Sequence, residues 1–276
     1  MIIWLASYPK SGNTWIRTFI SSIIFSKDGI SNFNNLEKIP QYPMRRHFHN
    51  LVENFQNINE IKKNWIISQD KMNLDNKIKF LKTHHVNCKI GTDSFTNLDN
   101  TKGVIYIVRD PRNIISSLSN HYQHDFKFST DFLLNEKSFL SNKDPNYKTE
   151  ENIITLLGSW KNHYNSWKIS SNLLLIRYED LILDVKSQVN RLSNFLKKFA
   201  YFYTNEIKIN NIIETTSFEL LKKKEENEGF EEAVNSKIKF FNSGPKSNWK
   251  NIIDEKLIHK IEKSFEKEMK ELNYLS

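Results

Sequence analysis

Four short runs of apolar residues recur along the chain and are typical of buried strands. They lie at residues 2–6, 78–83, 103–108 and 173–177. Between them, apolar residues recur every three or four positions, a spacing typical of amphipathic helices. The clearest such stretch is residues 14–25, where one face carries Trp15, Ile16, Phe19, Ile20, Ile23 and Ile24. Further helices are expected from about Pro111 to Tyr122 and over residues 153–170, 185–199 and 254–272.

Buried strands that alternate with helices favour a parallel sheet, because parallel neighbours need long crossover connections. The pattern therefore predicts an α/β fold with a central parallel sheet flanked by helices on both faces. No repeat or linker divides the sequence, so we expect a single domain over residues 1–276. Residues 28–50, 120–152 and 222–247 lack clear periodicity, and loops of this length often build a ligand site. Disorder is the alternative for the charged run at residues 222–233.

The 276-residue chain has a formal net charge of +8 and a sequence pI of about 9.2. Such a charge has two explanations: general solubility, or a basic cleft that attracts an anionic ligand. The one cysteine, Cys88, excludes an intramolecular disulfide. The apolar run at the N-terminus is too short for a signal peptide, and no segment approaches the roughly 18 apolar residues of a membrane span. We therefore expect a cytoplasmic protein.

The segment SYPKSGNTW, residues 7–15, stands between the first predicted strand and the first predicted helix. A turn between a strand and a helix directs backbone N–H groups at an anion. The residues suited to a phosphate are a glycine, a lysine and two hydroxyl residues, at Gly12, Lys10, Ser11 and Thr14. The triphosphate-binding pattern is G-x-x-x-x-G-K-[ST], but Trp4 and Pro9 stand at its two glycine positions. The segment thus predicts a phosphate site that is not the usual nucleoside triphosphate loop.

Two later strands also end in residues suited to an anion. The strand at 78–83 runs into Lys82 and His84, and the strand at 103–108 runs into Arg109. Ligands of open α/β sheets bind at the carboxyl ends of the strands. We therefore expect Lys10, Lys82 and Arg109 to share one edge of the sheet with the His84 imidazole.

With these segments in place, the chain resembles the sulfotransferases that use 3′-phosphoadenosine 5′-phosphosulfate (PAPS). YPKSGNTW resembles their 5′-phosphosulfate loop, VRDPRNIISS their 3′-phosphate motif, and LKTHH the segment with the catalytic lysine and histidine. GSWKNHYNSW resembles the family's aromatic helix and IRYEDL the strand end after it. TTSFELLKKK and SGPKSNWKN resemble the two late cofactor segments. The matches follow family order over residues 2 to about 275, and they imply the P-loop-like sulfotransferase fold.

The resemblance implies transfer of a sulfuryl group from PAPS to an acceptor hydroxyl or amine, which leaves adenosine 3′,5′-bisphosphate (PAP). His84 would be the general base, a task that suits a neutral imidazole. Lys10 would stabilise the leaving oxygen and Lys82 the transferring group. No metal is expected, because lysine and arginine can neutralise the donor, and Asp110 is interpreted as a helix cap.

The family comparison also assigns residues to the rest of the donor. Arg109 and Ser117 would bind the 3′-phosphate, for which a guanidinium fork is well suited. Trp15 and Phe218 would sandwich the adenine, with core packing as the alternative for both. Further donor contacts are expected from the phosphate loop, beside the adenine and in the last motif, at Lys10, Ser11, Gly12, Asn13, Thr14, Tyr178, Thr216, Gly244 and Lys246.

Some positions depart from the family pattern. The last motif usually opens with Arg-Lys-Gly, but residues 242–244 read Asn-Ser-Gly, so two cations are missing. The backbone of Gly244 and the side chain of Lys246 are the expected substitutes. Asn13 stands where many members have threonine. Asp254 and Glu255 stand where some relatives have a Thr-Val dimerisation pattern. The oligomeric state is therefore left open, with a homodimer as one alternative.

Two other functions remain open at this point. A small-molecule kinase that uses ATP and Mg²⁺ would need a Walker-type loop, and the missing glycines argue against it. A non-catalytic nucleic-acid-binding protein would fit the basic pI, but no recognition motif or basic stripe with interleaved aromatics occurs outside the proposed cleft, so no nucleic acid is expected. No motif identifies the acceptor, which is expected to be a small molecule or a glycan.

Overall fold

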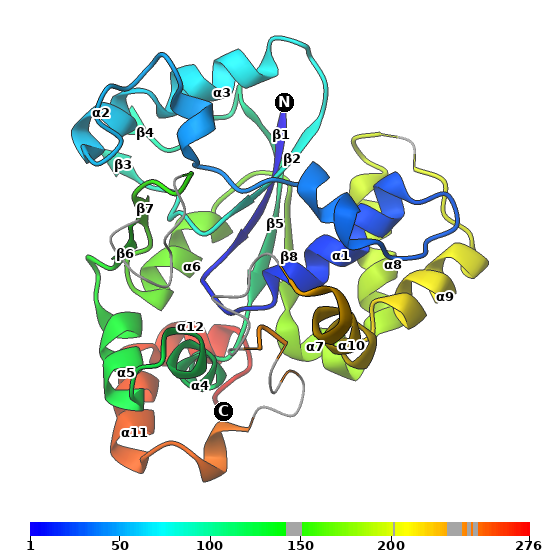
Figure 1. Cartoon of the computed structure of the whole chain (residues 1–276). Coiled ribbons are helices and arrows are strands. Elements are labelled where there is room, and N and C mark those ends of the chain that lie inside the picture. The colour runs from blue at the N-terminus through cyan, green and yellow to red at the C-terminus, as the bar shows by residue number, and fades with distance from the viewer. Residues whose placement is uncertain (142–150, 201, 231–238, 242–243, 245–247) are drawn as a thin grey trace.

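The computed structural model of the chain describes residues 1–141, 151–200, 202–230, 239–241, 244 and 248–276. A parallel four-stranded sheet lies at its centre, with strand order β2-β1-β5-β8 (Figure 1). The strands are β1 (Ile2–Ser7), β2 (Lys79–Thr83), β5 (Thr101–Val108) and β8 (Leu173–Arg177). All four predicted strands and their parallel arrangement are confirmed.

The register of the sheet brings the ends of the strands to one edge. Leu5 of β1 pairs with Lys82 of β2, and Ser7 of β1 pairs with Ile107 of β5. The segments that leave β1, β2 and β5 therefore emerge side by side, which positions the predicted site residues close to one another.

Helices cover both faces of the sheet, as the alternation of strands and helices predicts (Figure 1). Alternate side chains of β1 point to opposite faces, so Ile3 and Leu5 enter one core cluster while Trp4 enters the other. The first face is covered by α1 (Asn13–Phe25), α8 (Val185–Leu196) and α9 (Glu206–Thr215). The second is covered by α4 (Pro111–Tyr122), α6 (Trp160–Lys168), α11 (Glu255–Ser264) and α12 (Glu266–Glu271).

The remaining elements are short. The helices are α2 (Ile58–Lys63), α3 (Trp65–Asn73), α5 (Phe126–Leu134), α7 (Tyr178–Leu183) and α10 (Phe218–Glu228). Two-residue strands form the pairs β3 (Lys89–Ile90) with β4 (Asp93–Ser94), and β6 (Phe139–Leu140) with β7 (Thr155–Leu156). The 3₁₀ helices that lie wholly within the described residues are η1 (Phe33–Lys38), η2 (Arg45–Phe48) and η5 (Trp249–Asn251). Among the described residues, no helix combines the length and apolarity that crossing a membrane requires.

Two predicted helices are wrong in their bounds. The helix expected over residues 153–170 begins only at Trp160, because residues 155–156 pair with β6 and Ser159 caps the helix by accepting from the Asn162 N–H. The helix expected over residues 254–272 is broken at Phe265, whose ring is buried against Trp160 at a centroid distance of 5.2 Å.

Two of the stretches without clear periodicity contain helices. Helix α5 lies within residues 120–152, where Asp125 caps it by accepting from the Phe128 N–H. Helix α10 runs through residue 228, so the disorder alternative for the charged run is wrong for that part. Residues 231–233 of the run lie outside the described residues.

Candidate functional site

The loop between β1 and α1 is curled by two residues in the left-handed region, Lys10 with φ of 66° and Gly12 with φ of 97°. A Cβ atom at Gly12 would lie 2.5 Å from Cδ2 of Tyr178, which is far inside van der Waals contact. Only glycine therefore fits this position, because both the backbone and the neighbouring ring exclude a side chain. The close approach joins the loop to the first residue of α7.

Two polar side chains of the loop have different surroundings. Asn13 donates from Nδ2 to the carbonyl of Leu5 and to Oγ of Ser7, both at 3.1 Å, so its amide ties the loop back to β1. Ser11 is fully buried, and its Oγ has no hydrogen-bond partner among the described residues. A buried hydroxyl without a partner is costly. Its place before the uncapped N-terminus of α1 suits an anion, since the first N–H groups of a helix also need acceptors.

Arg109 connects the phosphate loop to the end of β5. Its Nη1 donates to the carbonyl of Lys10 at 3.1 Å, and its guanidinium lies over the ring of Tyr178, 4.2 Å from the centroid. The side chain is buried, and Nε has no partner within the described part of the chain. The structure therefore places Arg109 beside the loop that contains Lys10, as predicted. Ser117, the other predicted 3′-phosphate residue, is half-buried on α4.

His84 follows β2 at the same edge of the sheet. Its Nδ1 lies 2.8 Å from the backbone carbonyl of Ser7, at the end of β1. Because a carbonyl can only accept, Nδ1 donates to it, and Nε2 is the ring nitrogen that could accept a proton when the imidazole is neutral. Lys82, two positions before His84 on β2, is 6% exposed. The structure thus brings the predicted base to the edge where the phosphate loop begins.

His163 of α6 supports the backbone of His84 and was not singled out in the sequence. Its Nε2 donates to the carbonyl of His84 at 3.1 Å, and its Nδ1 accepts from the Tyr106 hydroxyl at 2.8 Å. Burial lowers the pKa of His163 to about 3, so the ring is neutral at neutral pH. Its position within GSWKNHYNSW gave no sign of these contacts, because His84 and Tyr106 lie in distant segments of the sequence.

Trp15 and Phe218, the two residues predicted to hold adenine, are brought together by a contact between α1 and the start of α10. Nε1 of Trp15 donates to the backbone carbonyl of Thr216 at 2.8 Å, two residues before Phe218 begins α10. The Thr216 side chain is fully buried and its hydroxyl donates to the carbonyl of Ile212. The Trp15 ring also meets the ring of Tyr178 edge-on, with centroids 5.8 Å apart.

The last cofactor segment is only partly described. A Cβ atom at Gly244 would overlap the Phe218 ring, so Gly244 packs directly against the predicted adenine residue. Lys246 lies outside the described residues. Just before this segment in the sequence, the Phe240 ring covers Nζ of Lys10 at 4.3 Å from the centroid.

Glu225 of α10 fixes that ring in place. Its two carboxylate oxygens accept from the backbone N–H groups of Phe240 and Phe241, at 2.6 and 2.9 Å. No pattern in the sequence points to this contact, since Glu225 stands within the charged run for which disorder is the alternative.

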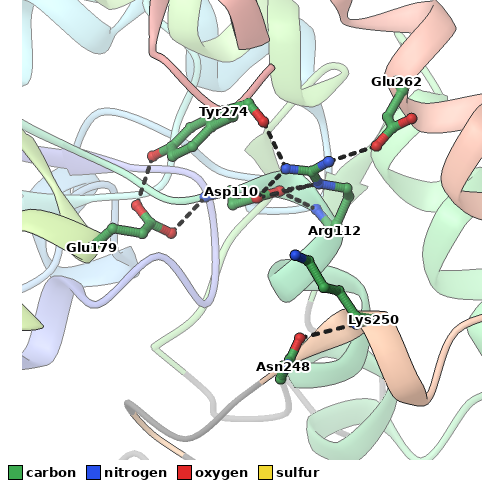
Figure 2. A network of polar contacts seen from close by, with 7 residues as sticks. All are labelled: Asp110, Arg112, Glu179, Asn248, Lys250, Glu262 and Tyr274. Atoms are coloured by element: carbon green, nitrogen blue, oxygen red, sulfur yellow. Dashed lines mark hydrogen bonds and ion pairs between the residues drawn. The ribbon is translucent and has the colours of Figure 1, made fainter. Parts of the chain in front are cut away.

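Asp110 and Arg112 form a network at the start of α4 (Figure 2). Asp110 caps the helix by accepting from the Arg112 N–H at 2.9 Å, which confirms its interpretation as a capping residue. The Arg112 guanidinium donates to Asp110 at 2.7 Å, to Glu262 of α11 and to the carbonyl of Tyr274 at 2.8 Å. It also lies over the ring of Trp249, 4.2 Å from the centroid. Arg112 therefore joins the 3′-phosphate motif to the last cofactor segment.

Glu179 completes this network from the other side (Figure 2). Its Oε1 accepts from the backbone N–H of Asp110 at 3.0 Å, and its Oε2 accepts from the Tyr274 hydroxyl at 2.8 Å. Burial raises the pKa of the Glu179 carboxyl. In the same view, Lys250 donates from its backbone N–H to Asn248 at 3.1 Å and so begins the short helix η5.

The arrangement brings together basic side chains, the His84 imidazole and two buried polar atoms that have no partner among the described residues, Oγ of Ser11 and Nε of Arg109. Ser11 and Arg109 suit the oxygens of a phosphorylated ligand, and His84 suits removal of a proton from a second ligand. Among the described residues, no group of three or more His, Cys, Asp or Glu side chains could hold a metal ion.

Comparison with known proteins agrees with this chemistry. The model of the sulfotransferase domain family matches residues 2–273, which is nearly the whole chain. Luciferin sulfotransferase from Photinus pyralis is 26% identical over 94% of this chain and 69% of that protein. Flavonol 3-sulfotransferase from Flaveria bidentis is 26% identical over 97% of this chain and 81% of that protein.

A solved structure has a similar fold. The crystal structure of mouse sulfotransferase SULT7A1 complexed with PAP aligns with a TM-score of 0.62 and 21% identity, over 97% of this chain and 84% of that chain. At this identity the likeness concerns the fold, and it confirms the arrangement of the sheet and its covering helices.

Proposed function

This chain belongs to the sulfotransferase family, and we propose that it transfers the sulfuryl group of PAPS to a hydroxyl or amine of a small-molecule or glycan acceptor. One observation carries the choice of donor. Arg109 donates to the backbone of Lys10 at 3.1 Å, so the two motifs expected to bind phosphates adjoin. Each motif also contains a buried polar atom without a partner among the described residues, Oγ of Ser11 and Nε of Arg109. A ligand with two phosphate groups fits both.

The phosphate loop would hold the 5′ end of the donor. When bound, PAPS supplies a sulfuryl group attached to a phosphate oxygen. The hydroxyls of Ser11 and Thr14 and the N–H groups around Gly12 would bind the phosphate, and Asn13 would contribute its backbone, because its side chain bonds to β1. Lys10 would neutralise the charge that develops on the leaving oxygen, and Lys82 the charge on the transferring group.

The remaining donor contacts are the ones that the family resemblance implies. Arg109 and Ser117 would bind the 3′-phosphate, with help from the Gly244 backbone and the Lys246 side chain. Trp15 and Phe218 would hold the adenine, and Tyr178 and Thr216 would contact its edge or the nearby phosphate. Since the Thr216 hydroxyl donates to Ile212, its carbonyl or a rotated hydroxyl would make this contact.

His84 would act as the general base through Nε2. The Ser7 carbonyl holds the proton on Nδ1 and fixes the ring, so Nε2 can accept the proton of the acceptor hydroxyl or amine. His163 holds the backbone at the same point. The acceptor class rests on relatives whose names give luciferin and flavonol, both small molecules.

Thermal stabilisation by PAP, compared with ATP and Mg²⁺, tests the donor. At a PAP concentration of 100 times Kd, the stabilisation is about 2.7 kcal/mol, or roughly 5–10 °C in Tm for a chain of this size. Stabilisation by ATP and Mg²⁺ alone would instead support a kinase. Incubation of the protein with sulfur-labelled PAPS and a panel of alcohols, phenols, amines and saccharides then identifies the acceptor class. Absence of PAP binding would refute the proposed donor.

A further inference from the structure

Tyr274, three residues after the last helix α12, reaches the centre of the Arg112 network (Figure 2). Its hydroxyl donates to Oε2 of Glu179 at 2.8 Å, and its backbone carbonyl accepts from Nη2 of Arg112 at 2.8 Å. The guanidinium of Arg177 covers its ring, 4.8 Å from the centroid. Tyr274 therefore bridges the start of α7 and the start of α4 with two hydrogen bonds of its own.

Glu179 transmits the position of Tyr274 to the residue that is expected to bind the 3′-phosphate. Its other oxygen, Oε1, accepts from the Asp110 N–H, in the peptide that directly follows Arg109. Glu179 also follows Tyr178, whose ring supports the Arg109 guanidinium at 4.2 Å. One carboxylate thus fixes both the backbone beside Arg109 and the segment that carries its stacking partner.

The hydroxyl of Tyr274 decides how this carboxylate is held. The Glu179 side chain is half-buried, and a carboxylate partly withdrawn from water is destabilised when either oxygen lacks a donor. Without the Tyr274 hydroxyl, Oε2 would have to turn toward water or toward another donor, and the bond from Oε1 to the Asp110 N–H would shift with it. The position of the Arg109 guanidinium would then be less well defined.

We propose that Tyr274 is a positioning residue for recognition of the donor's 3′-phosphate, acting on Arg109 through Glu179. The inference rests on the proposed function only in that Arg109 binds this phosphate. The chain end then contributes to donor affinity although it lies outside every motif that resembles the family's donor-binding segments. Tyr274 is expected to affect binding of the 3′-phosphate and not the transfer step.

The chain offers a matched control in Tyr164. Its hydroxyl donates to Oε1 of Glu271 at 2.8 Å, the same kind of bond at the same length. Tyr164 lies on α6 and Glu271 ends α12. The Tyr164 ring contacts Tyr106 of β5, but the pair makes no hydrogen bond to Glu179, Asp110 or Arg109 among the described residues. Removal of either hydroxyl deletes one tyrosine–carboxylate hydrogen bond. Because Glu271 is exposed and also pairs with Lys168, Tyr164→Phe controls for the loss of the bond and not for the burial of its acceptor.

The test compares Tyr274→Phe and Tyr164→Phe by calorimetric titration with PAP and with adenosine 5′-phosphate, which lacks the 3′-phosphate. For Tyr274→Phe we expect about a fivefold to tenfold weaker affinity for PAP, the loss of roughly one hydrogen bond, with unchanged affinity for adenosine 5′-phosphate. Tyr164→Phe should leave the ratio of the two affinities at its wild-type value. In turnover, Tyr274→Phe should raise the donor KM and leave kcat at saturating donor unchanged.

Arg109→Ala sets the scale, because it removes the 3′-phosphate contact itself and should bring the PAP affinity close to that for adenosine 5′-phosphate. If Tyr274→Phe leaves the ratio of the two affinities unchanged, including by an equal loss of affinity for both ligands, the positioning role is overturned. Should Tyr274→Phe unfold, Glu179→Gln provides the second variant. Because the glutamine amide could still bond to both partners, with the Tyr274 hydroxyl accepting, Glu179→Ala is tested beside it. Glu179→Ala removes the acceptor of the Asp110 N–H together with that of Tyr274, so the ratio should again fall. A wild-type protein that binds both ligands equally would instead refute the assignment of Arg109, and with it the proposed function.

Discussion

His84 and Ser7 are joined at the carboxyl edge of the sheet, where Nδ1 of the imidazole donates to the Ser7 carbonyl at 2.8 Å. The bond links the residue after β2 to the last residue of β1, its neighbour in the sheet. The bond engages Nδ1 of His84 as a donor, so Nε2 is the nitrogen that would act as the base.

Replacement of His84 by alanine should lower kcat by about 100-fold to 10,000-fold, the usual contribution of a general base. Affinity for PAP should stay near the wild-type value, because the imidazole is assigned to the acceptor and not to the donor. Steady-state transfer and calorimetric titration measure the two effects. His259→Ala, a change of an exposed residue on α11, serves as the control, and normal turnover by His84→Ala would remove it from the mechanism.

Ser11→Ala should separate ligand binding from stability. The Ser11 hydroxyl is buried and has no partner among the described residues, so its removal should leave the free energy of unfolding within about 0.5 kcal/mol of wild type or raise it. Affinity for PAP should fall about tenfold, since a hydrogen bond to a charged group is lost.

Ser22 is the matched control for that experiment. It is also buried, lies on α1 and has an Oγ without a partner within the described residues. Ser22→Ala should change stability as Ser11→Ala does and leave PAP affinity unchanged. If the two variants bind PAP equally well, Ser11 does not contact the donor.

Gly12→Ala should lower both stability and donor affinity. Alanine at a positive φ costs about 1–2 kcal/mol, and the added Cβ would also press on the Tyr178 ring, 2.5 Å away. Because that ring supports Arg109, we expect a further loss of about 1–3 kcal/mol in stability and weaker PAP binding. Denaturant unfolding and titration give both quantities.

Gly91 distinguishes the backbone effect from the clash. It also has a positive φ, 65°, but a Cβ there would meet nothing within 4 Å. Gly91→Ala should therefore show only the backbone cost and bind PAP normally. Equal stability losses for Gly12→Ala and Gly91→Ala would mean that Tyr178 moves aside without cost.

Stability should fall as the pH is lowered from about 6.5 toward 3, since the unfolded chain protonates its histidines near pH 6.5. Burial lowers the pKa of three folded histidines, to about 4 for His47 and about 3 for His85 and His163. In this window the unfolded state binds more protons than the folded state, so each such histidine contributes a slope of up to about 1.4 kcal/mol per pH unit. At pH 7 and above their contribution to stability is fully present.

Urea unfolding at pH 6.5 and pH 5 measures this slope. His163→Gln should make the slope shallower by about one proton. An unchanged slope in His163→Gln would mean that the His163 ring is not kept neutral by burial.

The four main strands and the strand-end cluster could be predicted because each depends on a local pattern. An apolar run such as residues 103–108 is buried on both sides wherever it lies in a parallel sheet. The bounds of α6 could not be predicted, because Thr155 and Leu156 pair with residues 139–140, beyond the reach of helical periodicity.

The supporting contacts of the candidate site were missed for a similar reason. His163 acts on His84 from 79 positions away, and Tyr274 acts on Glu179 from 95 positions away. Motifs indicate side chains that are expected to touch a ligand. The residues that hold those side chains are set by the packing of distant segments, which a single sequence does not specify.

The contact between Lys10 and Phe240 bears on how readily an anion is received. A ring face attracts an ammonium group but cannot take its proton, and at exposed sites the attraction is worth only about 0.5–1 kcal/mol. This contact therefore orients the lysine before any substrate arrives, and breaking it when a phosphate binds costs little free energy. Glu225 fixes the backbone of Phe240, and the Phe240 ring in turn contacts Lys10. The carboxylate thus helps to hold the lysine through an uncharged residue, which leaves the positive charge of Lys10 available to an anion.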